Sequence, residues 1–352
     1  MKTILRTPSH AQPARKMKMA GFGLVEIMVA LVIGLILLGG IGVVFLGAKQ
    51  TFRTQDDFSR IQENVRYALE TIGVDVRMAG YSGCVNLSAI DPNNPAAPIP
   101  VGVIANNPPA LGLDQALRGY VGGAWTATAA APANWVANTG VLQITRAADS
   151  GVTLTGNLVP TNANVQITGN PYNFVAGEAL LVSNCETADL FRATSVSSGG
   201  GTVTITHSAA QNSTPAPNTV YEYQNGAEVF RIANTVYFIG TNPAGNPALY
   251  RTTFGGATEE LVENVEDMVM RFGVDTNNDF IVDSYVDVAG VTDWRQVLTA
   301  RISLVFRSSN TNVATQDQNS YVVENTTVNL GAADRRLRQV ATATFGVRNR
   351  LP

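Results

Sequence analysis

The first hydrophobic feature of the chain is an apolar run over residues 22–47, which contains no Pro and a single charged residue, Glu26. These 26 residues are enough to span about 30 Å of hydrocarbon as a helix. A carboxylate at the centre of such a helix costs roughly 3 kcal/mol, and less near its end. A charged side chain within an apolar run is unfavourable unless it has a role, so Glu26 indicates a function.

A second pattern follows directly over residues 48–80. Apolar side chains recur every three or four positions while charged ones fill the other faces, which predicts an amphipathic helix. The apolar stripe consists of Phe58, Ile61, Val65, Leu69, Ile72 and Val76. No Pro interrupts residues 22–78, so we expect one continuous helix with Gly80 and Gly83 as its breakers. Its first half would face lipid, and its second half would pack on a globular domain.

The pattern then changes to the period of strands. Alternating segments predict strands at 141–147, 164–169 and 202–208, and two more around a turn that carries Cys185. Gly199–Gly201 and Asn225–Gly226 have the composition of hairpin turns. Residues 86–138 are rich in Pro, Ala and Asn, so we expect a long surface excursion with short strands at most.

The C-terminal part predicts a short helix followed by strands. Thr258 suits a helix cap, Glu259 and Glu260 suit its first turn, and Leu261, Val265 and Met268 would share one face. The segments MVMRFGV, VLTARISLVFRS and QVATATFGVRN alternate as strands. The predicted fold class is α+β: one long N-terminal helix packs on an antiparallel β-sheet domain, residues 81–352, with an elaborated β-rich insertion.

Charge separates the first residues from the rest. Residues 1–21 contain Lys2, Arg6, Arg15, Lys16 and Lys18 and no acidic residue. Without these five, the chain keeps 19 basic and 27 acidic residues, a net charge of −8. An acidic chain lacks the electrostatic footprint of a nucleic-acid-binding protein. A basic leader ahead of an apolar helix is expected to stay on the cytoplasmic side of the membrane.

Catalytic motifs are scarce, and we expect no enzyme. The two histidines are His10, in the basic leader, and His207, in a Thr-rich strand. One histidine does not make a zinc site, and neither G-x-S-x-G nor a phosphate-binding loop is present. The two cysteines, Cys84 and Cys185, would be buried thiols in the cytosol or a disulfide in an exported domain.

One acidic cluster has the spacing of a calcium loop. Asp275, Asn277, Asp279 and Asp283 occupy offsets 1, 3, 5 and 9, with the Ile281 carbonyl at offset 7. Two residues depart from that pattern: Phe280 replaces the usual Gly, and Val286 replaces the bidentate Glu. The competing interpretation is a polar hairpin loop, because Asp and Asn favour turns.

The hexapeptide Gly21-Phe-Gly-Leu-Val-Glu26 resembles the processing site of type IV prepilins. The resemblance implies that a prepilin peptidase cuts after Gly21, removes the leader, residues 1–21, and methylates the new N-terminus at Phe22. Gly23 departs from the commoner Thr or Ser. Glu26 would lie one turn from the new amino group, where the helix dipole favours an anion, and would pair with the amine of a neighbouring subunit.

Three further segments, RMAGYSGC, VEDMVMRFGVDTNNDFIVD and ATATFGVRNRL, look like those of PilW-type minor pilins. This resemblance implies a lollipop-shaped subunit that primes pilus assembly and sits at the pilus tip, with other minor pilins and the major pilin as partners. It implies insertion in the inner membrane before assembly, a place in the pilus afterwards, and therefore a Cys84–Cys185 disulfide. The alternatives are a J-type minor pseudopilin of a type II secretion system and a membrane-anchored periplasmic enzyme.

Overall fold

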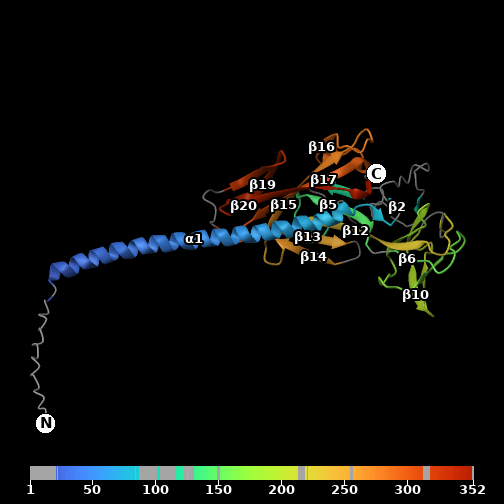
Figure 1. Cartoon of the computed structure of the whole chain (residues 1–352), viewed down its shortest axis with the longest axis horizontal. Coiled ribbons are helices and arrows are strands. Elements are labelled where there is room, and N and C mark those ends of the chain that lie inside the picture. The colour runs from blue at the N-terminus through green and yellow to red at the C-terminus, as the bar shows by residue number, and fades with distance from the viewer. Residues whose placement is uncertain are drawn as a thin grey trace, which may run out of the picture. The chain divides into compact units, whose positions relative to one another are not determined.

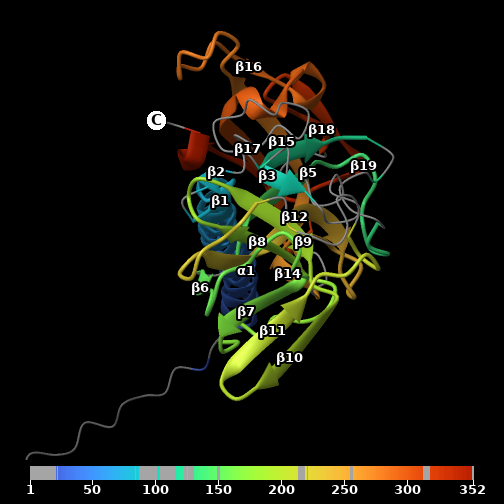
Figure 2. The ribbon, with the colours of Figure 1, turned by 90° about the vertical axis from the view of Figure 1, so that its right-hand side faces the viewer.

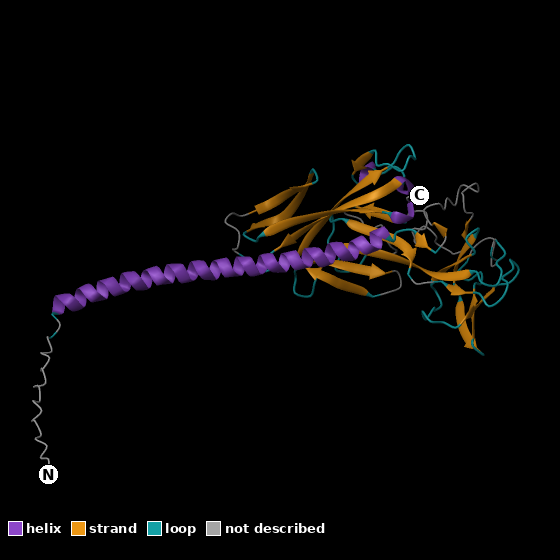
Figure 3. Ribbon diagram, viewed as in Figure 1, coloured by secondary structure: helices purple, strands orange, loops and turns teal. Residues whose placement is uncertain are grey.

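The structure is a computed structural model of the whole chain. It describes residues 21, 23–83, 85–86, 101–103, 116–122, 125, 131–148, 151–212, 219, 221–253, 257–311 and 318–350. The chain divides into two compact units, residues 1–54 and 55–352. The α+β fold class is confirmed, with one long helix and antiparallel sheets (Figures 1 and 3).

The long helix α1 runs without interruption over Leu24–Arg77, 54 residues. Gly39, Gly40 and Gly42 do not break it. Gly80 and Gly83 follow it with φ of 76° and 73°, the left-handed conformation that ends a helix and that glycine adopts without strain. The predicted breakers are thus in the expected place, followed by a short hairpin of β1 (Tyr81–Ser82) and β2 (Val85–Asn86).

In the second unit, the C-terminal half of α1 lies along two sheets (Figure 1). The first sheet is antiparallel in the order β16-β15-β17-β20. Its strands are β15 (Val265–Val274), β16 (Ser284–Val286), β17 (Val297–Arg307) and β20 (Arg338–Gly346). Alternation along β17 directs Ile302, Leu304 and Phe306 to the core, as predicted. The hairpin of β18 (Gln318–Val323) and β19 (Thr326–Asp334) covers the other face through Val323 and Val328.

The second sheet has nine strands, with β14-β13-β12-β8-β9-β3 as its main path. Its central strand β12 (Glu228–Thr241) pairs with β13 (Pro247–Thr253), β5 (Val141–Ala147), β8 (Ala179–Ser183) and β6 (Val152–Thr153). The remaining strands are β3 (Val101–Val103), β4 (Leu117–Tyr120), β9 (Ala188–Arg192) and β14 (Thr258–Glu263). All pairs within it are antiparallel except β3 with β9.

Among the described residues, two large hydrophobic cores form beside two smaller clusters. The main core lies among α1, the four-stranded sheet and one face of the nine-stranded sheet, with Ile72, Tyr237 and Phe272 among its fully buried side chains. The second core holds Phe191, Tyr223 and Val229. It packs against a three-stranded sheet of β7 (Asn164–Thr168), β10 (Ser195–Gly199) and β11 (Thr202–Thr206), which lies below β8 and β9 in Figure 2. Strand β12 contributes residues to both cores.

The predicted strands at 141–147, 164–169 and 202–208 are confirmed, as are the two strands around Cys185. Gly200 and Gly201, with φ of 61° and 84°, make the turn between β10 and β11. The segment at residues 86–138 contains the short strands β3 and β4 among its described residues.

The predicted helix at Thr258–Met268 is wrong, because residues 258–263 form β14 and residue 265 begins β15. Glu259 and Glu260, which suggested the start of a helix, make contacts within the sheet instead. Glu259 forms an ion pair with Arg251 on the facing strand, and Glu260 accepts hydrogen bonds from Asn242 and Tyr250. Asn264, with φ of 62°, then turns the chain between the two strands.

The predicted hairpin at Asn225–Gly226 is wrong in its partners. A turn is present, with Gly226 at φ 99°, but the residues before it form no strand paired with β12. Tyr223 makes a single bridge to Leu158, whereas β12 pairs with the strand that follows it, β13, and with β5, β6 and β8. A turn signal is local, whereas the choice of partner depends on burial of the whole strand.

The amphipathic stripe needs one correction. Ile61, Ile72 and Val76 are buried and Val65 and Leu69 pack against the main core, but Phe58 is 43% exposed. Two aspartates, Asp57 and Asp75, lie on the buried face instead. The helix therefore meets the sheets through a mixed surface of apolar side chains and two carboxylates.

Candidate functional site

The candidate site begins where α1 begins. The Gly23 carbonyl accepts hydrogen bonds from the N–H groups of Glu26 and Ile27, at 3.0 and 3.2 Å, so Gly23 caps the first turn. Glu26 is the acidic side chain of that turn. An anion is favoured there because the unpaired N–H groups make this end of a helix positive. Gly21 is described and exposed, whereas Phe22 and the leader up to residue 20 lie outside the described residues.

The helix after Glu26 presents apolar side chains on every side. From Leu24 to Leu46 all the large hydrophobic side chains are more than half exposed within the unit. Of the described helices, α1 alone is long and apolar enough to cross a membrane. Full burial of each such side chain is worth about 1.5–3 kcal/mol. Transfer of this surface into lipid therefore outweighs the roughly 3 kcal/mol that one carboxylate could cost.

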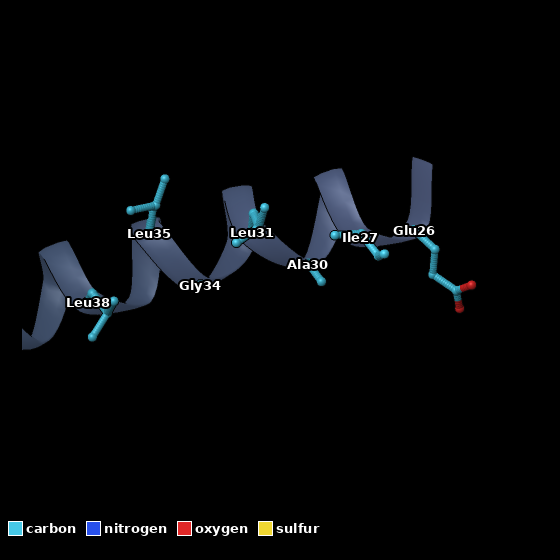
Figure 4. Close-up of a pocket in the computed structure, with 7 residues that line it drawn as sticks. All are labelled: Glu26, Ile27, Ala30, Leu31, Gly34, Leu35 and Leu38. Carbon is cyan, nitrogen blue, oxygen red and sulfur yellow. The ribbon is translucent and has the colours of Figure 1, made fainter. Parts of the chain in front are cut away.

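Glu26 stands at one end of a shallow hollow in the helix surface (Figure 4). The small residues Ala30 and Gly34 follow it at intervals of four, which places all three on one face of the helix. Figure 4 shows the Glu26 carboxylate extending away from the helix axis. Small residues at this spacing allow two helices in a membrane to approach closely.

The other end of α1 is fastened to the nine-stranded sheet by a buried carboxylate. Asp75 accepts a hydrogen bond of 2.6 Å from the Tyr237 hydroxyl of β12. Its other oxygen accepts two from the Arg146 guanidinium of β5, at 3.2 and 3.0 Å. Burial, with the adjacent Asp75 charge, raises the pKa of Tyr237 well above its ordinary value. Sequence reasoning missed this group, although an aspartate beside the apolar stripe was a visible signal.

Further contacts hold α1 along its packed half. Asp57, 1% exposed, accepts from the side-chain amide of Asn310 at 3.1 Å. Gly73 lies against the Phe345 ring, and the Arg77 guanidinium lies 5.4 Å from the centre of the same ring. Asn349, near the C-terminal end of the chain, donates to the Ala79 carbonyl.

The acidic loop, residues 275–283, is a closed network of hydrogen bonds. The Asp275 carboxylate, 3% exposed, accepts from the backbone N–H groups of Asn278, Asp279 and Phe280. Asp283 accepts from the N–H and hydroxyl of Thr276, which hold the pKa of Asp283 below its usual range. Asp279 accepts a hydrogen bond from the Ile281 N–H, so the backbone of Ile281 belongs to the same network.

This arrangement leaves the calcium site a prediction. Among the described residues, no group of three or more His, Cys, Asp or Glu side chains is placed to hold a metal ion. Asn277 donates its amide to Asp279 at 3.2 Å. The loop also contains Phe280 in the left-handed conformation, φ 64°, at the place where calcium loops use Gly. A bulky side chain is rare in this region of φ and ψ and costs about 1–2 kcal/mol there.

Two other residues singled out in the sequence, Cys185 and His207, lie within the described part of the chain. Cys185 lies in the turn between β8 and β9 with φ of 71°, and its N–H donates to the Ser183 hydroxyl. Cys84 lies outside the described residues, so the disulfide stays a prediction. His207 is fully buried just after β11, with its ring 5.2 Å from that of Phe191.

Two segments of this chain match models of known families. Residues 236–349 match the model of the family described as type IV pilus-assembly protein W. Residues 16–42 match that of the prokaryotic N-terminal methylation motif. No curated protein and no solved structure gives a significant match. The resemblance found in the sequence is thereby confirmed.

Proposed function

We propose that this chain, a PilW-type, prepilin-like protein of type IV pilus systems, is a minor pilin that primes assembly and occupies the pilus tip. The observation that carries the proposal is the start of α1. A single carboxylate in the first turn of α1, within the otherwise apolar run of residues 22–47, lies inside the matched methylation motif, ahead of a sheet domain matched to pilus assembly. Both matched families belong to pilus structure rather than to catalysis.

In this proposal the peptidase removes residues 1–21 and methylates Phe22. Residues 22–47 then anchor the subunit in the inner membrane with its N-terminus on the cytoplasmic side, and residues 48–80 and 81–352 form the external part. The Glu26 carboxylate attracts the positive amino group of a neighbouring subunit, because both charges are costly in hydrocarbon unless paired. Other minor pilins and the major pilin are the proposed partners, and the subunit leaves the membrane when it enters the pilus.

The first prediction concerns processing and Glu26. Mass spectrometry of the mature protein should find N-methyl-Phe22 as the first residue. The variant Glu26→Val should insert in the membrane and keep its folded sheet domain, since Glu26 belongs to the other compact unit. Its incorporation into pili should fall at least tenfold, as expected for losing about 1.4 kcal/mol. Immunoblots of sheared pili and of membranes measure the two pools.

A matched control is Glu63→Val, which removes an exposed carboxylate from the same helix outside the apolar run. It should leave piliation unchanged. Normal piliation by Glu26→Val in a strain without the native copy, or a mature chain that retains its leader, would contradict the proposal. A deletion that abolishes enzyme secretion while twitching motility persists would instead identify a pseudopilin of a type II secretion system.

A further inference from the structure

The loop between β15 and β16 exposes two large apolar side chains to solvent. Phe280 is 51% exposed and the adjacent Ile281 is 66% exposed. In Figure 2 the loop beside β16 projects from the body of the sheets. Exposed apolar side chains are common singly, but two consecutive ones at the tip of a projecting loop form a contiguous patch of the kind found at contact sites.

This patch is held rigidly. The backbone N–H groups of residues 275, 276, 278, 279, 280, 281 and 283 all donate hydrogen bonds to acceptors within the loop or at its base. Asp275 supplies the acceptors for three of them, and the Gln296 and Val274 carbonyls fasten the two ends of the loop. A surface fixed in advance loses little conformational entropy when it binds, so rigidity favours a contact role.

The backbone at the tip of the loop is strained at Phe280. Phe280 has φ of 64°, a conformation that Gly adopts freely and that a phenylalanine rarely adopts. Its side chain is half exposed and so contributes little to the cores. Strained residues that persist without a packing role tend to occur at functional positions.

The charge around the tip restricts what it binds. Residues 275–283, which form the loop, contain Asp275, Asp279 and Asp283 and no Lys or Arg. Asp279 and Asp283 are exposed beside the apolar pair. This negative charge repels the anionic headgroups of a membrane surface, and it also repels the same loop of a second copy.

We infer that the tip formed by Phe280 and Ile281 docks into an apolar pocket rimmed by Lys or Arg on a different subunit of the same pilus. The partner's identity as a pilus subunit rests on the proposed function; the chemistry of its pocket follows from the tip. The apolar pair fills the pocket, and Asp279 and Asp283 face the basic rim, where opposite charges speed association and fix orientation.

The test uses the full chain in cells that assemble pili. A photo-crosslinking amino acid, p-benzoylphenylalanine, is placed at position 281 and, as the control, at exposed Val175 in the second unit. Illumination should join position 281 to one other pilus subunit, and peptide mapping should locate the adduct in an apolar pocket flanked by Lys or Arg. Position 175 should not give this adduct.

A second substitution separates contact from folding. Phe280→Gly should lower the adduct at position 281 about tenfold, as loss of an interface anchor does, while the melting temperature stays the same or rises because Gly relieves the backbone strain. Asp279→Asn keeps a hydrogen-bond acceptor for Ile281 but removes a charge. It should slow formation of the adduct at low salt more than at high salt.

Several results would overturn the inference. These are an adduct to lipid, an adduct to a second copy of this chain, no adduct at position 281, and an adduct that persists unchanged in Phe280→Gly. A marked fall in the melting temperature of Phe280→Gly would likewise assign Phe280 to folding. In each case cleavage after Gly21 and dependence of pili on Glu26 are measured separately, so the proposed function can stand while this inference fails.

Discussion

At the residue scale, Gly73 determines how closely α1 approaches the four-stranded sheet. A Cβ added there would lie 2.5 Å from Cε1 and 2.9 Å from Cδ1 of Phe345, whose ring is buried in the main core. Glycine in a helix costs about 1 kcal/mol relative to alanine. Its presence at this position is explained by the ring that packs against it rather than by the helix.

Gly73→Ala should therefore destabilise the protein by about 1–2 kcal/mol, because overpacking outweighs the gain in helix propensity. Denaturant unfolding of the detergent-solubilised chain measures the difference. Gly47→Ala is the matched control, since nothing lies within 4 Å of a Cβ added there. The double variant Gly73→Ala with Phe345→Leu should recover part of the loss. Equal stability of Gly73→Ala and the wild type would show that the sheet yields freely at this contact.

The hydroxyl of Tyr237 makes a second prediction at this scale. Tyr237→Phe leaves one Asp75 oxygen without its buried donor and should cost about 1–3 kcal/mol at pH 7. The pKa of Tyr237 is raised above 10.0 in the folded protein, so its contribution is complete below the unfolded pKa and declines as the pH rises through and above about 10. The stability gap between wild type and Tyr237→Phe should narrow there.

Chemical denaturation between pH 7 and 11 checks this dependence. Tyr285→Phe is the control, because Tyr285 is exposed and makes its hydroxyl contact at the surface with Thr299. It should change stability by less than about 0.5 kcal/mol at every pH. A gap between wild type and Tyr237→Phe that stays constant up to pH 11 would count against the raised pKa of the buried Tyr237 hydroxyl.

At the scale of elements, the sequence predicted those whose signals are local. The helix α1 was predictable because a long apolar run continues into an amphipathic one without Pro, and Gly200–Gly201 because a tight turn needs left-handed residues. The helix at 258–268 was predicted wrongly because Glu259 and Glu260 suit both a helix start and a cross-strand pair with Arg251. Only the position of β13 decides between them, and that position is not local in the sequence.

The candidate site divides in the same way. Glu26 was visible because a charge within an apolar run is conspicuous in the sequence alone. Asp57 and Asp75 resemble ordinary surface residues of an amphipathic helix until Asn310, Arg146 and Tyr237 are brought to them from strands and loops far along the chain. Buried polar contacts of this kind depend on the whole fold.

The loop at 275–283 carries the calcium prediction. With weak affinity, a Kd of roughly 10⁻³ M, about 10 mM calcium should stabilise the folded chain by about 1.4 kcal/mol. Thermal melting in calcium, magnesium and chelator measures this. Asp279→Asn should abolish the calcium increment with little change in chelator. Asp275→Ala should lower the melting temperature in both conditions, because three backbone N–H groups lose their acceptor. Identical melting of the wild type in calcium and chelator would leave a polar loop only.

At the scale of the whole molecule, one covalent link is predicted. Cys84 and Cys185 should form a disulfide that closes a loop of about 100 residues, for which the entropy estimate is about 4.7 kcal/mol before any strain is subtracted. Reduction of the wild type and the double variant Cys84→Ser with Cys185→Ser should lower the melting temperature by the same amount as each other. Mass spectrometry of alkylated, non-reduced protein counts the thiols directly, and two free thiols would refute the link.

The strand β12 belongs to both hydrophobic cores of the second unit. Its first residues, including Val229, are buried in the second core, while Tyr237 and Ile239 are buried in the main core. Loss of this strand from one core would also expose buried residues of the other core. The two cores should therefore unfold cooperatively. Despite its two large cores, the second unit should therefore melt in one calorimetric transition, with a van't Hoff enthalpy that accounts for both.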